Sequence, residues 1–228
     1  MESVNNILEF HDVTGRNKRF NLRDVSFAVE PGYIYGLMGE NGAGKTTLMK
    51  YIIDDKLKYD GEILVNGTEV RGNHDKVMDL IGYVSEDHVF FEDRTGMQNA
   101  QLLGPFFEQF DMNILLQCAK SMNLSLHTTY KKMSRGEKLK FQLAFVAAYK
   151  PVLYMLDEVT VGMDPVFRIE FFDMLRELIK DESCSVLMTS HIQSEIEIKT
   201  DYVAVMKDGC LSEFSESMEF SGMLNKED

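Results

Sequence analysis

The chain has 228 residues, and its 24 lysines and arginines against 37 aspartates and glutamates give a formal net charge of −13. With 44% hydrophobic and 27% charged residues, it has the composition of a soluble globular protein of about one domain, which excludes a disordered or fibrous chain. The acidic balance disfavours nucleic acid and anionic membranes as general partners, because both attract basic surfaces.

The pattern also argues against a secreted, membrane-spanning or zinc-binding chain. The first residues lack a signal-peptide pattern and no run approaches 18 apolar residues, so we expect no membrane span. Cys118, Cys184 and Cys210 lie far apart and form no CxxC pair, which favours free thiols in a reducing cytoplasm. The five histidines form no close pair, which disfavours a histidine metal site.

Short strands are predicted for the first part of the chain. Alternating residues at 7–13 and 25–29 indicate two strands, and a stronger strand at 33–38 runs into a glycine-rich turn. A helix over 45–53 should follow the turn. Residues 61–67, GEILVNG, predict an exposed strand that an Asn-Gly turn closes.

Helical spacing replaces the strand pattern between about residues 95 and 149. We expect at least three helices there, with breaks near Gly104-Pro105 and around 124–133. The apolar runs at 152–156, 185–189 and 202–206 then suit buried parallel strands, with a helix over 165–180 between the first two. Strand, helix, strand in this order indicates an α/β fold. Residues 213–228 hold five acids and one lysine, and predict a short helical tail or a frayed end.

The turn after residue 38 has the sequence pattern of a phosphate-binding loop. Residues 39–46, GENGAGKT, match G-x-x-x-x-G-K-[ST] between a strand and a helix, where glycines let successive backbone amides converge on a phosphate. A chance glycine-rich turn is the alternative. Lys45 would supply charge to the terminal phosphates, and the Thr46 hydroxyl would bind Mg²⁺. The expected nucleotide-binding residues are Asn41, Gly42, Ala43, Gly44, Lys45, Thr46 and Thr47.

Two carboxylates, Asp157 and Glu158, end the apolar run at 152–156. An Asp at such a strand end holds Mg²⁺ in P-loop NTPases. Neighbouring residues on a strand point to opposite faces, so the two acids cannot share one role unless the chain turns there. One would serve the metal, and the other would orient or deprotonate water. A strand that simply ends in two solvated acids is the alternative.

Together these features resemble the ATP-binding cassette ATPases over nearly the whole chain. Residues 133–137, MSRGE, resemble the signature loop LSGGQ, residues 161–164, VGMD, resemble the D-loop, and residues 189–191, TSH, resemble the switch-histidine segment. Each also has a plain structural reading. Ser134 and Glu137 form a capping box, and Asp164 before a proline is a helix N-cap.

The resemblance implies an α/β P-loop NTPase (RecA-like) fold with a parallel sheet core, an N-terminal antiparallel β-subdomain and an inserted α-helical subdomain. The whole chain, 1–228, would be one ATPase domain. Its nucleotide-binding core with the β-subdomain would comprise residues 1–90 and 150–212. The helical subdomain with the signature motif would comprise 91–149, and an acidic C-terminal tail 213–228.

The resemblance also implies residue roles, with ATP and Mg²⁺ as cofactors. Two copies would bind two ATP molecules head to tail, and closure of the pair would be the mechanical output. The catalytic residues would be Lys45, Glu158, which polarises water, and His191, which contacts the γ-phosphate. The Mg²⁺ ligands would be Thr46, Asp157 and Glu86. Ser134 and Gly136 would close the site of the partner chain.

The chain departs from the family pattern in four places. Glu86 stands where the family has Gln, and an ionised carboxylate cannot donate a hydrogen bond. Arg135 and Glu137 replace Gly and Gln of the signature, and Val159 replaces Pro after the two acids. The aromatic residue that stacks on adenine would fall near Asn17. The nearest aromatic residue is Phe20, which could equally be part of a strand core.

Residues 139–164, together with Ser-Arg-Gly at 134–136 and FFEQFD at 106–111, are most similar to ATPases of bacterial ABC-2-type exporters, which handle peptides, antibiotics or lipid-active molecules. This implies an ATP-hydrolysing exporter subunit that pairs with a second ATPase, as homodimer or heterodimer, and with integral membrane permease subunits at the inner face of the cell membrane. The helical middle would dock there, although at least half of its phenylalanines, at 90, 91, 106, 107 and 110, should be core. The alternatives are a soluble cassette ATPase without a transport role, or a regulatory ATP switch with weak hydrolysis.

Overall fold

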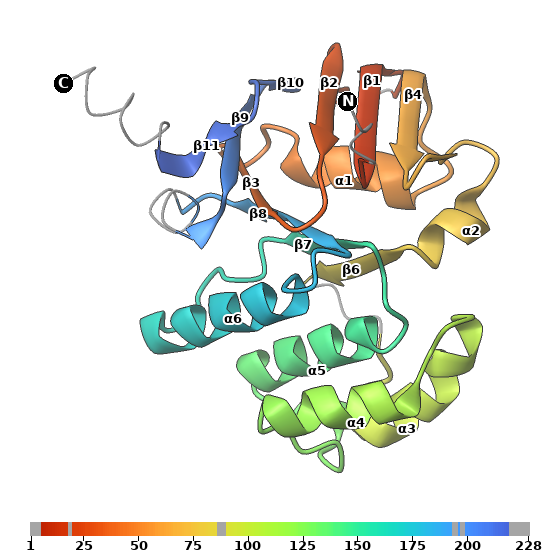
Figure 1. Cartoon of the computed structure of the whole chain (residues 1–228), viewed down its shortest axis with the longest axis vertical. Helices are drawn as coiled ribbons and strands as arrows, with labels where there is room; N and C mark the ends of the chain where they lie inside the picture. Colours follow the sequence, from red (N-terminus) through yellow and green to blue (C-terminus); the bar gives the residue numbers. More distant parts are fainter. Residues whose placement is uncertain (1–5, 18–19, 86–89, 193–195, 197–198, 219–228) are drawn as a thin grey trace.

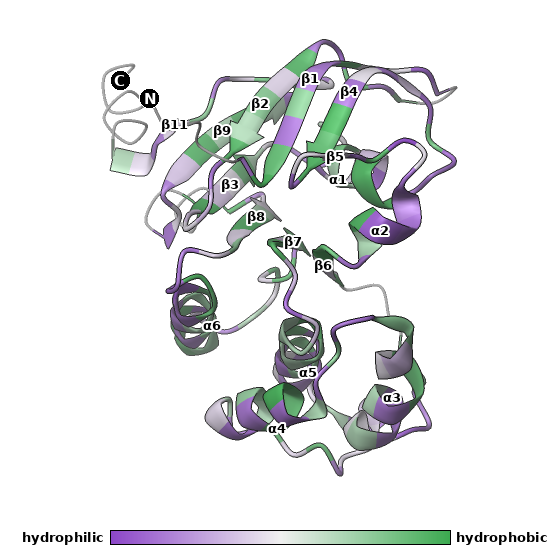
Figure 2. Ribbon diagram, turned by 45° about the vertical axis from the view of Figure 1, so that its right-hand side comes forward, coloured by the Kyte–Doolittle hydropathy of each residue, from purple (hydrophilic) through white to green (hydrophobic). Residues whose placement is uncertain are grey.

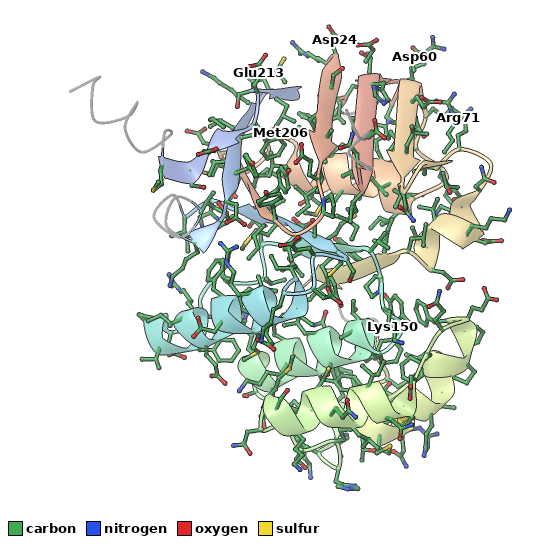
Figure 3. All side chains as sticks on the ribbon, in the orientation of Figure 1. Asp24, Asp60, Arg71, Lys150, Met206 and Glu213 are labelled. Carbon is green, nitrogen blue, oxygen red and sulfur yellow. The ribbon has the colours of Figure 1, made fainter. Side chains whose placement is uncertain are left out.

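Two β-sheets and two groups of helices make up the chain in its computed structural model, which describes residues 6–17, 20–85, 90–192, 196 and 199–218. The antiparallel sheet and α1 lie at one end of the long axis, the core sheet lies in the middle, and α3, α4 and α5 lie at the other end (Figure 1). Side chains fill the spaces between these layers (Figure 3).

The antiparallel sheet is built from the N-terminal third of the chain. Its strands are β1 (Leu8–Gly15), β2 (Val25–Val29), β4 (Tyr59–Val65) and β5 (Thr68–Glu69), in the order β2-β1-β4-β5. Asn66 and Gly67, with φ of 48° and 72°, form the two-residue turn between β4 and β5. A turn of this kind needs positive φ at both positions, so the Asn-Gly prediction is confirmed. Hydrophobic and hydrophilic residues alternate along these strands (Figure 2).

The seven-stranded core sheet has the order β10-β9-β3-β8-β7-β6, with β11 paired to β9. Its parallel strands are β3 (Ile34–Met38), β6 (Ile81–Ser85), β7 (Leu153–Asp157), β8 (Ser185–Ser190) and β9 (Tyr202–Lys207). Every residue of β7 and β8 is buried, because the sheet is covered on both faces. Along β8, Val186 and Met188 pack into the cluster with the helices, and Leu187 packs into the cluster with α1 and the antiparallel sheet.

Except for α2, which the sequence did not predict, the helices follow the predicted order. They are α1 (Lys45–Ile53), α2 (His74–Met78), α3 (Gly96–Leu103), α4 (Met112–Ser121), α5 (Arg135–Ala147) and α6 (Pro165–Leu178), with short 3₁₀ turns at 104–106 and 130–132. The predicted helix over 45–53 and both predicted breaks in the helical middle are confirmed. No helix among the described residues is long and apolar enough to cross a membrane.

The C-terminal prediction is wrong for its first part. Within residues 213–228, the short strand β11 (Ser215–Glu216) pairs antiparallel with β9, and β10 (Cys210–Leu211), which precedes this segment, does so too. Phe214 packs against Phe27 of the antiparallel sheet and Tyr35 of the core sheet, with ring centroids 5.5 and 5.2 Å apart. Tertiary contacts therefore hold a segment whose local pattern is weak. Residues 219–228 lie outside the described part of the chain.

The middle phenylalanines divide as predicted. Phe90 is buried, Phe107 stacks on Tyr149 with centroids 4.1 Å apart, and Phe110 packs against Phe145. Phe91 and Phe106 are exposed by 51% and 81%.

The cysteines are free thiols, as expected, and burial raises the pKa of Cys184 to about 11.

Candidate nucleotide-binding site

The site lies at the carboxyl ends of three neighbouring parallel strands. The glycine-rich loop follows β3, Asp157 ends β7, and His191 follows β8. Open α/β sheets bind ligands at this edge, because the carboxyl ends of parallel strands meet there. A cavity of about 400 Å³ lies beside the loop, lined by Met38, Gly39, Glu40, Asn41, His191 and Val205.

The loop needs glycine where it turns most sharply. Gly39 has φ of 154°, and a Cβ there would lie 2.4 Å from the backbone oxygen of Met206. Gly44 has φ of 118° and is the N-cap of α1, where no side chain accepts a hydrogen bond from the helix amides. The first amides of α1 are thus left to an anion, which suits a phosphate at the positive end of the helix dipole.

Lys45 is buried and directed into the loop. Its Nζ donates to the backbone oxygens of Gly39 and Glu40 at 2.7 and 3.2 Å, and it forms an ion pair with Glu158 Oε1 at 3.1 Å. An ammonium group has three donors, so these contacts satisfy it. A phosphate oxygen would compete with them for Lys45.

The two acids face the same loop because the chain turns between them. Asp157 accepts from the Thr46 hydroxyl at 3.1 Å. Glu158 adopts a left-handed conformation with φ of 50°, which directs its carboxylate to Lys45 and to His191, whose Nδ1 lies 3.5 Å from Oε2. Neighbouring strand residues normally point to opposite faces, but the turn at Glu158 brings both carboxylates to the same side.

Two hydroxyl groups that the sequence did not single out complete the surroundings of Asp157. Thr189 Oγ1 donates to Oδ1 at 2.7 Å, and the Tyr83 hydroxyl donates to Oδ2 at 3.3 Å. In the sequence, Thr189 stands out only as part of the TSH segment. A hydroxyl two residues before His191, in an otherwise apolar run, is the signal that could have identified it.

The oxygen donors fit Mg²⁺. The Thr46 hydroxyl and the Asp157 carboxylate are hard oxygen ligands and lie 3.1 Å apart at the entrance to the loop. Among the residues that the structure describes, no cluster of three or more His, Cys, Asp or Glu side chains could hold a metal ion. Mg²⁺ in nucleotide sites uses one or two protein ligands, with phosphates and water as the others. Glu86 lies outside the described residues.

The signature segment begins α5 at a different cavity. Ser134 is the N-cap: its Oγ accepts from Glu137 N at 3.3 Å, and its own N–H donates to Glu137 Oε2 at 2.8 Å. The Ser134 N–H and the Ser134 hydroxyl both donate to Glu137 Oε2 at 2.8 Å, and these two bonds hold the pKa of Glu137 below its usual value. Arg135 Nη1 lies against Gly162, where a Cβ would approach it to 2.5 Å. The cavity of about 370 Å³ is lined by Ser134, Arg135, Gly136, Glu137, Lys140, Gly162, Met163, Asp164 and Phe167.

The structure thus places the predicted residues in two groups. Lys45, Thr46, Asp157, Glu158 and His191 converge at the loop. Ser134 and Gly136 instead share a cavity with the D-loop segment 161–164.

The base-stacking position holds no aromatic residue. The Asn17 amide donates to the Tyr51 hydroxyl, at 2.5 Å. Phe20 lies in no strand, so its interpretation as a strand core residue is wrong. Its ring instead lies beside Gly44, where a Cβ would be 2.7 Å from Cε1. Phe20 is therefore the aromatic side chain next to the phosphate-binding loop.

Comparisons with known proteins found a matching family and several relatives. The family model described as ABC transporter matches residues 22–161. The chain is 30% identical over 191 residues to the ABC transporter ATP-binding protein YtrB of Bacillus subtilis, covering 84% of this chain and 65% of that protein. It is 29% identical over 215 residues to the bacitracin transport ATP-binding protein BcrA of Enterococcus faecalis, covering 93% and 68%. The chain spans about two thirds of the length of these relatives.

Solved structures share the fold. An ATP binding subunit of an ABC transporter superposes with a TM-score of 0.84 at 24% identity, over 96% of this chain and 93% of that chain. The cbiO1 protein of Clostridium perfringens, part of the ABC transporter complex cbiONQ, gives a TM-score of 0.82 at 22% identity, over 96% and 91%. The predicted fold class, a P-loop core with an antiparallel subdomain and a helical insert, is confirmed.

Proposed function

The chain belongs to the ABC transporter family as an ATP-binding protein, and from this premise we propose that it hydrolyses ATP to drive an exporter. One observation carries the proposal. A buried lysine at the phosphate loop contacts a glutamate that also lies beside a histidine, while the neighbouring aspartate contacts the loop threonine. Phosphoryl transfer to water needs mainly such positioning and charge stabilisation.

Each residue has a role in the proposed reaction. Lys45 and the α1 amides bind the phosphates, and Thr46 and Asp157 hold Mg²⁺, which supplies charge neutralisation on the phosphate oxygens. When ATP binds, Lys45 exchanges Glu158 for phosphate oxygens. The released Glu158 carboxylate then accepts a proton from the attacking water, and His191 beside it contacts the γ-phosphate. Glu86 would be a third ligand of Mg²⁺. Asn41, Gly42, Ala43, Gly44 and Thr47 complete the phosphate-binding set.

Partners complete the site and transmit its closure. Ser134 and Gly136 would contact the γ-phosphate held by a second ATPase subunit, a second copy of the chain or a related one. Their separation from the loop in a single chain supports this role. Exposed Phe91 and Phe106 on the helical middle suit docking to permease subunits, which would hold the chain at the inner face of the membrane. The proposal also assigns the subdomains. The nucleotide-binding core with the β-subdomain would comprise residues 1–90 and 150–212, the helical subdomain residues 91–149, and the acidic C-terminal tail residues 213–228.

Steady-state ATP hydrolysis by the purified chain tests the proposal. Lys45→Ala should lose nucleotide binding. Glu158→Gln should bind ATP but release phosphate at least about a hundredfold more slowly, because general-base catalysis contributes about 10²–10⁴-fold. Glu108→Gln, an exposed carboxylate of the helical middle, is the matched control and should keep wild-type turnover. Undiminished turnover by the Glu158 variant would remove the general-base assignment. ATP binding without turnover by the wild type would favour a regulatory switch.

A further inference from the structure

Thr189 connects the two acids of the site through a single hydroxyl group. It lies on β8 opposite Asp157 of β7, and its side chain is fully buried. Its Oγ1 donates to Asp157 Oδ1 at 2.7 Å and accepts from the backbone N–H of Glu158 at 2.9 Å. A hydroxyl has one donor and two acceptor sites, so it can make both bonds at once.

The two hydrogen bonds stabilise the backbone angle of Glu158 and the orientation of the Asp157 carboxylate. Glu158 needs its left-handed φ of 50° to face Lys45, and non-glycine residues keep such angles only where surrounding contacts enforce them. The bond from Glu158 N to Thr189 fixes the backbone at that turn. The bond to Asp157 is charge-assisted and buried, which makes it strong and orients the carboxylate toward Thr46.

We propose that Thr189 is a positioning residue that sets Asp157 for Mg²⁺ and Glu158 for water through this one hydroxyl. The inference rests on the proposed function and adds to it a residue outside the loop and the acidic pair. Thr189 also lies two residues before His191, which follows β8 directly.

Valine at position 189 provides the test, because it keeps the β-branched shape and removes only the hydroxyl. Asp157 then loses a buried donor and the Glu158 N–H loses its acceptor. We expect Thr189→Val to lower kcat about ten- to a hundredfold and to raise the half-saturating Mg²⁺ concentration about tenfold, as loss of groups that orient metal ligands does. Affinity for a fluorescent, non-hydrolysable ATP analogue without Mg²⁺ should stay within about twofold, because Lys45 and the loop are untouched.

Two variants separate positioning from packing. Thr189→Ser retains the hydroxyl and should restore most of kcat and the Mg²⁺ dependence. Ser185→Ala removes another fully buried hydroxyl at the far end of the same strand, one that donates to the Glu30 backbone oxygen at 2.6 Å. It should leave both readouts unchanged. If the valine variant does not fold, Thr189→Ala also removes the hydroxyl, and its kcat and Mg²⁺ dependence can be compared with those of Thr189→Ser.

The outcomes distinguish this inference from the proposed function. Wild-type kcat and Mg²⁺ dependence in Thr189→Val would overturn the role of Thr189 while leaving the ATPase proposal intact. An equal loss in the serine and valine variants would also overturn it, because packing alone would then explain the effect. If the wild type lacks turnover, the ATPase proposal fails. The Mg²⁺ dependence of analogue binding then still decides the role of Thr189.

Discussion

Glu158 shows how one backbone angle can determine the chemistry of a site. An extended residue there would send its carboxylate to the face opposite Asp157. With φ of 50°, Glu158 reaches Lys45 and His191 while Asp157 reaches Thr46. Two adjacent acids thereby obtain different partners within one small volume.

Glu137 gives a pH-dependent prediction at the same scale. Hydrogen bonds from the Ser134 N–H and hydroxyl lower the pKa of Glu137 in the folded chain. The stabilisation is therefore present above the unfolded pKa, about 4.3, and is lost as the pH falls through the lower folded pKa. Glu137→Ala should reduce the free energy of unfolding by about 0.3–1 kcal/mol at pH 7, and by less near pH 3. Urea unfolding at both pH values measures the difference.

The control for Glu137 is a second capping box that cannot titrate. Thr95 and Gln98 form the same reciprocal hydrogen bonds at the start of α3. Gln98→Ala should cost a similar free energy at both pH values, because its amide keeps one charge state. An equal pH dependence in the two variants would remove the carboxylate explanation.

Residues of the site differ in how readily the sequence reveals them. Lys45 and Thr46 could be predicted because the loop motif is local and its spacing is itself the mechanism. Thr189 and Tyr83 could not, because their bonds to Asp157 depend on which strands become neighbours. Glu158 falls between these cases. The sequence shows an acid at the end of the strand, but the positive φ of Glu158 depends on its hydrogen bond to Thr189 of β8.

At the scale of elements, the close approach of α5 to β6 ties the signature helix to the core sheet. Gly82 makes the approach possible: a Cβ there would lie 2.0 Å from Val146 Cγ1 on α5. Gly82 has no positive φ, so its requirement is space rather than backbone freedom. Any movement of α5 relative to β6 would therefore change the contact between Val146 and Gly82.

Gly82→Ala tests the contact. The added methyl group should lower the free energy of unfolding by about 1–3 kcal/mol through overpacking. Val146→Ala removes the opposing methyl groups, so the double variant should be more stable than the sum of the single effects predicts, by about 0.5 kcal/mol or more. Urea unfolding of the four proteins gives this coupling energy. Additive effects would show that the two residues do not oppose each other.

Elements were predictable where their pattern was long. The helix α1 and the strands β7 and β8 have clear local signals, a glycine-lysine start or a continuous apolar run. The five-residue α2 and the two-residue β11 do not, since neighbours rather than their own periodicity stabilise them. Phe214 illustrates the reason: its partners, Phe27 and Tyr35, are distant in sequence.

At the scale of the whole molecule, the separation of two surfaces is the main feature. The loop cavity contains His191 and Asn41, and the signature cavity contains Ser134 and Gly136. The N-terminus of α5 presents positive dipole charge at the second cavity, where a phosphate held by another chain could bind. In the proposed dimer, each chain would hold one nucleotide at its own loop and would face the partner's nucleotide with the surface around Ser134 and Gly136.

This arrangement predicts that ATP assembles the chain into a dimer. Glu158→Gln should bind ATP without hydrolysing it, so light scattering after size-exclusion chromatography should show twice the monomer mass only with ATP. Adding Ser134→Arg should prevent the dimer, because the larger side chain fills the surface that meets the partner's γ-phosphate. Thr95→Arg breaks the equivalent capping box of α3 at similar cost in stability, about 1 kcal/mol, and should leave the dimer intact. A dimer that survives Ser134→Arg but not Thr95→Arg would place the interface at the start of α3 instead of the start of α5.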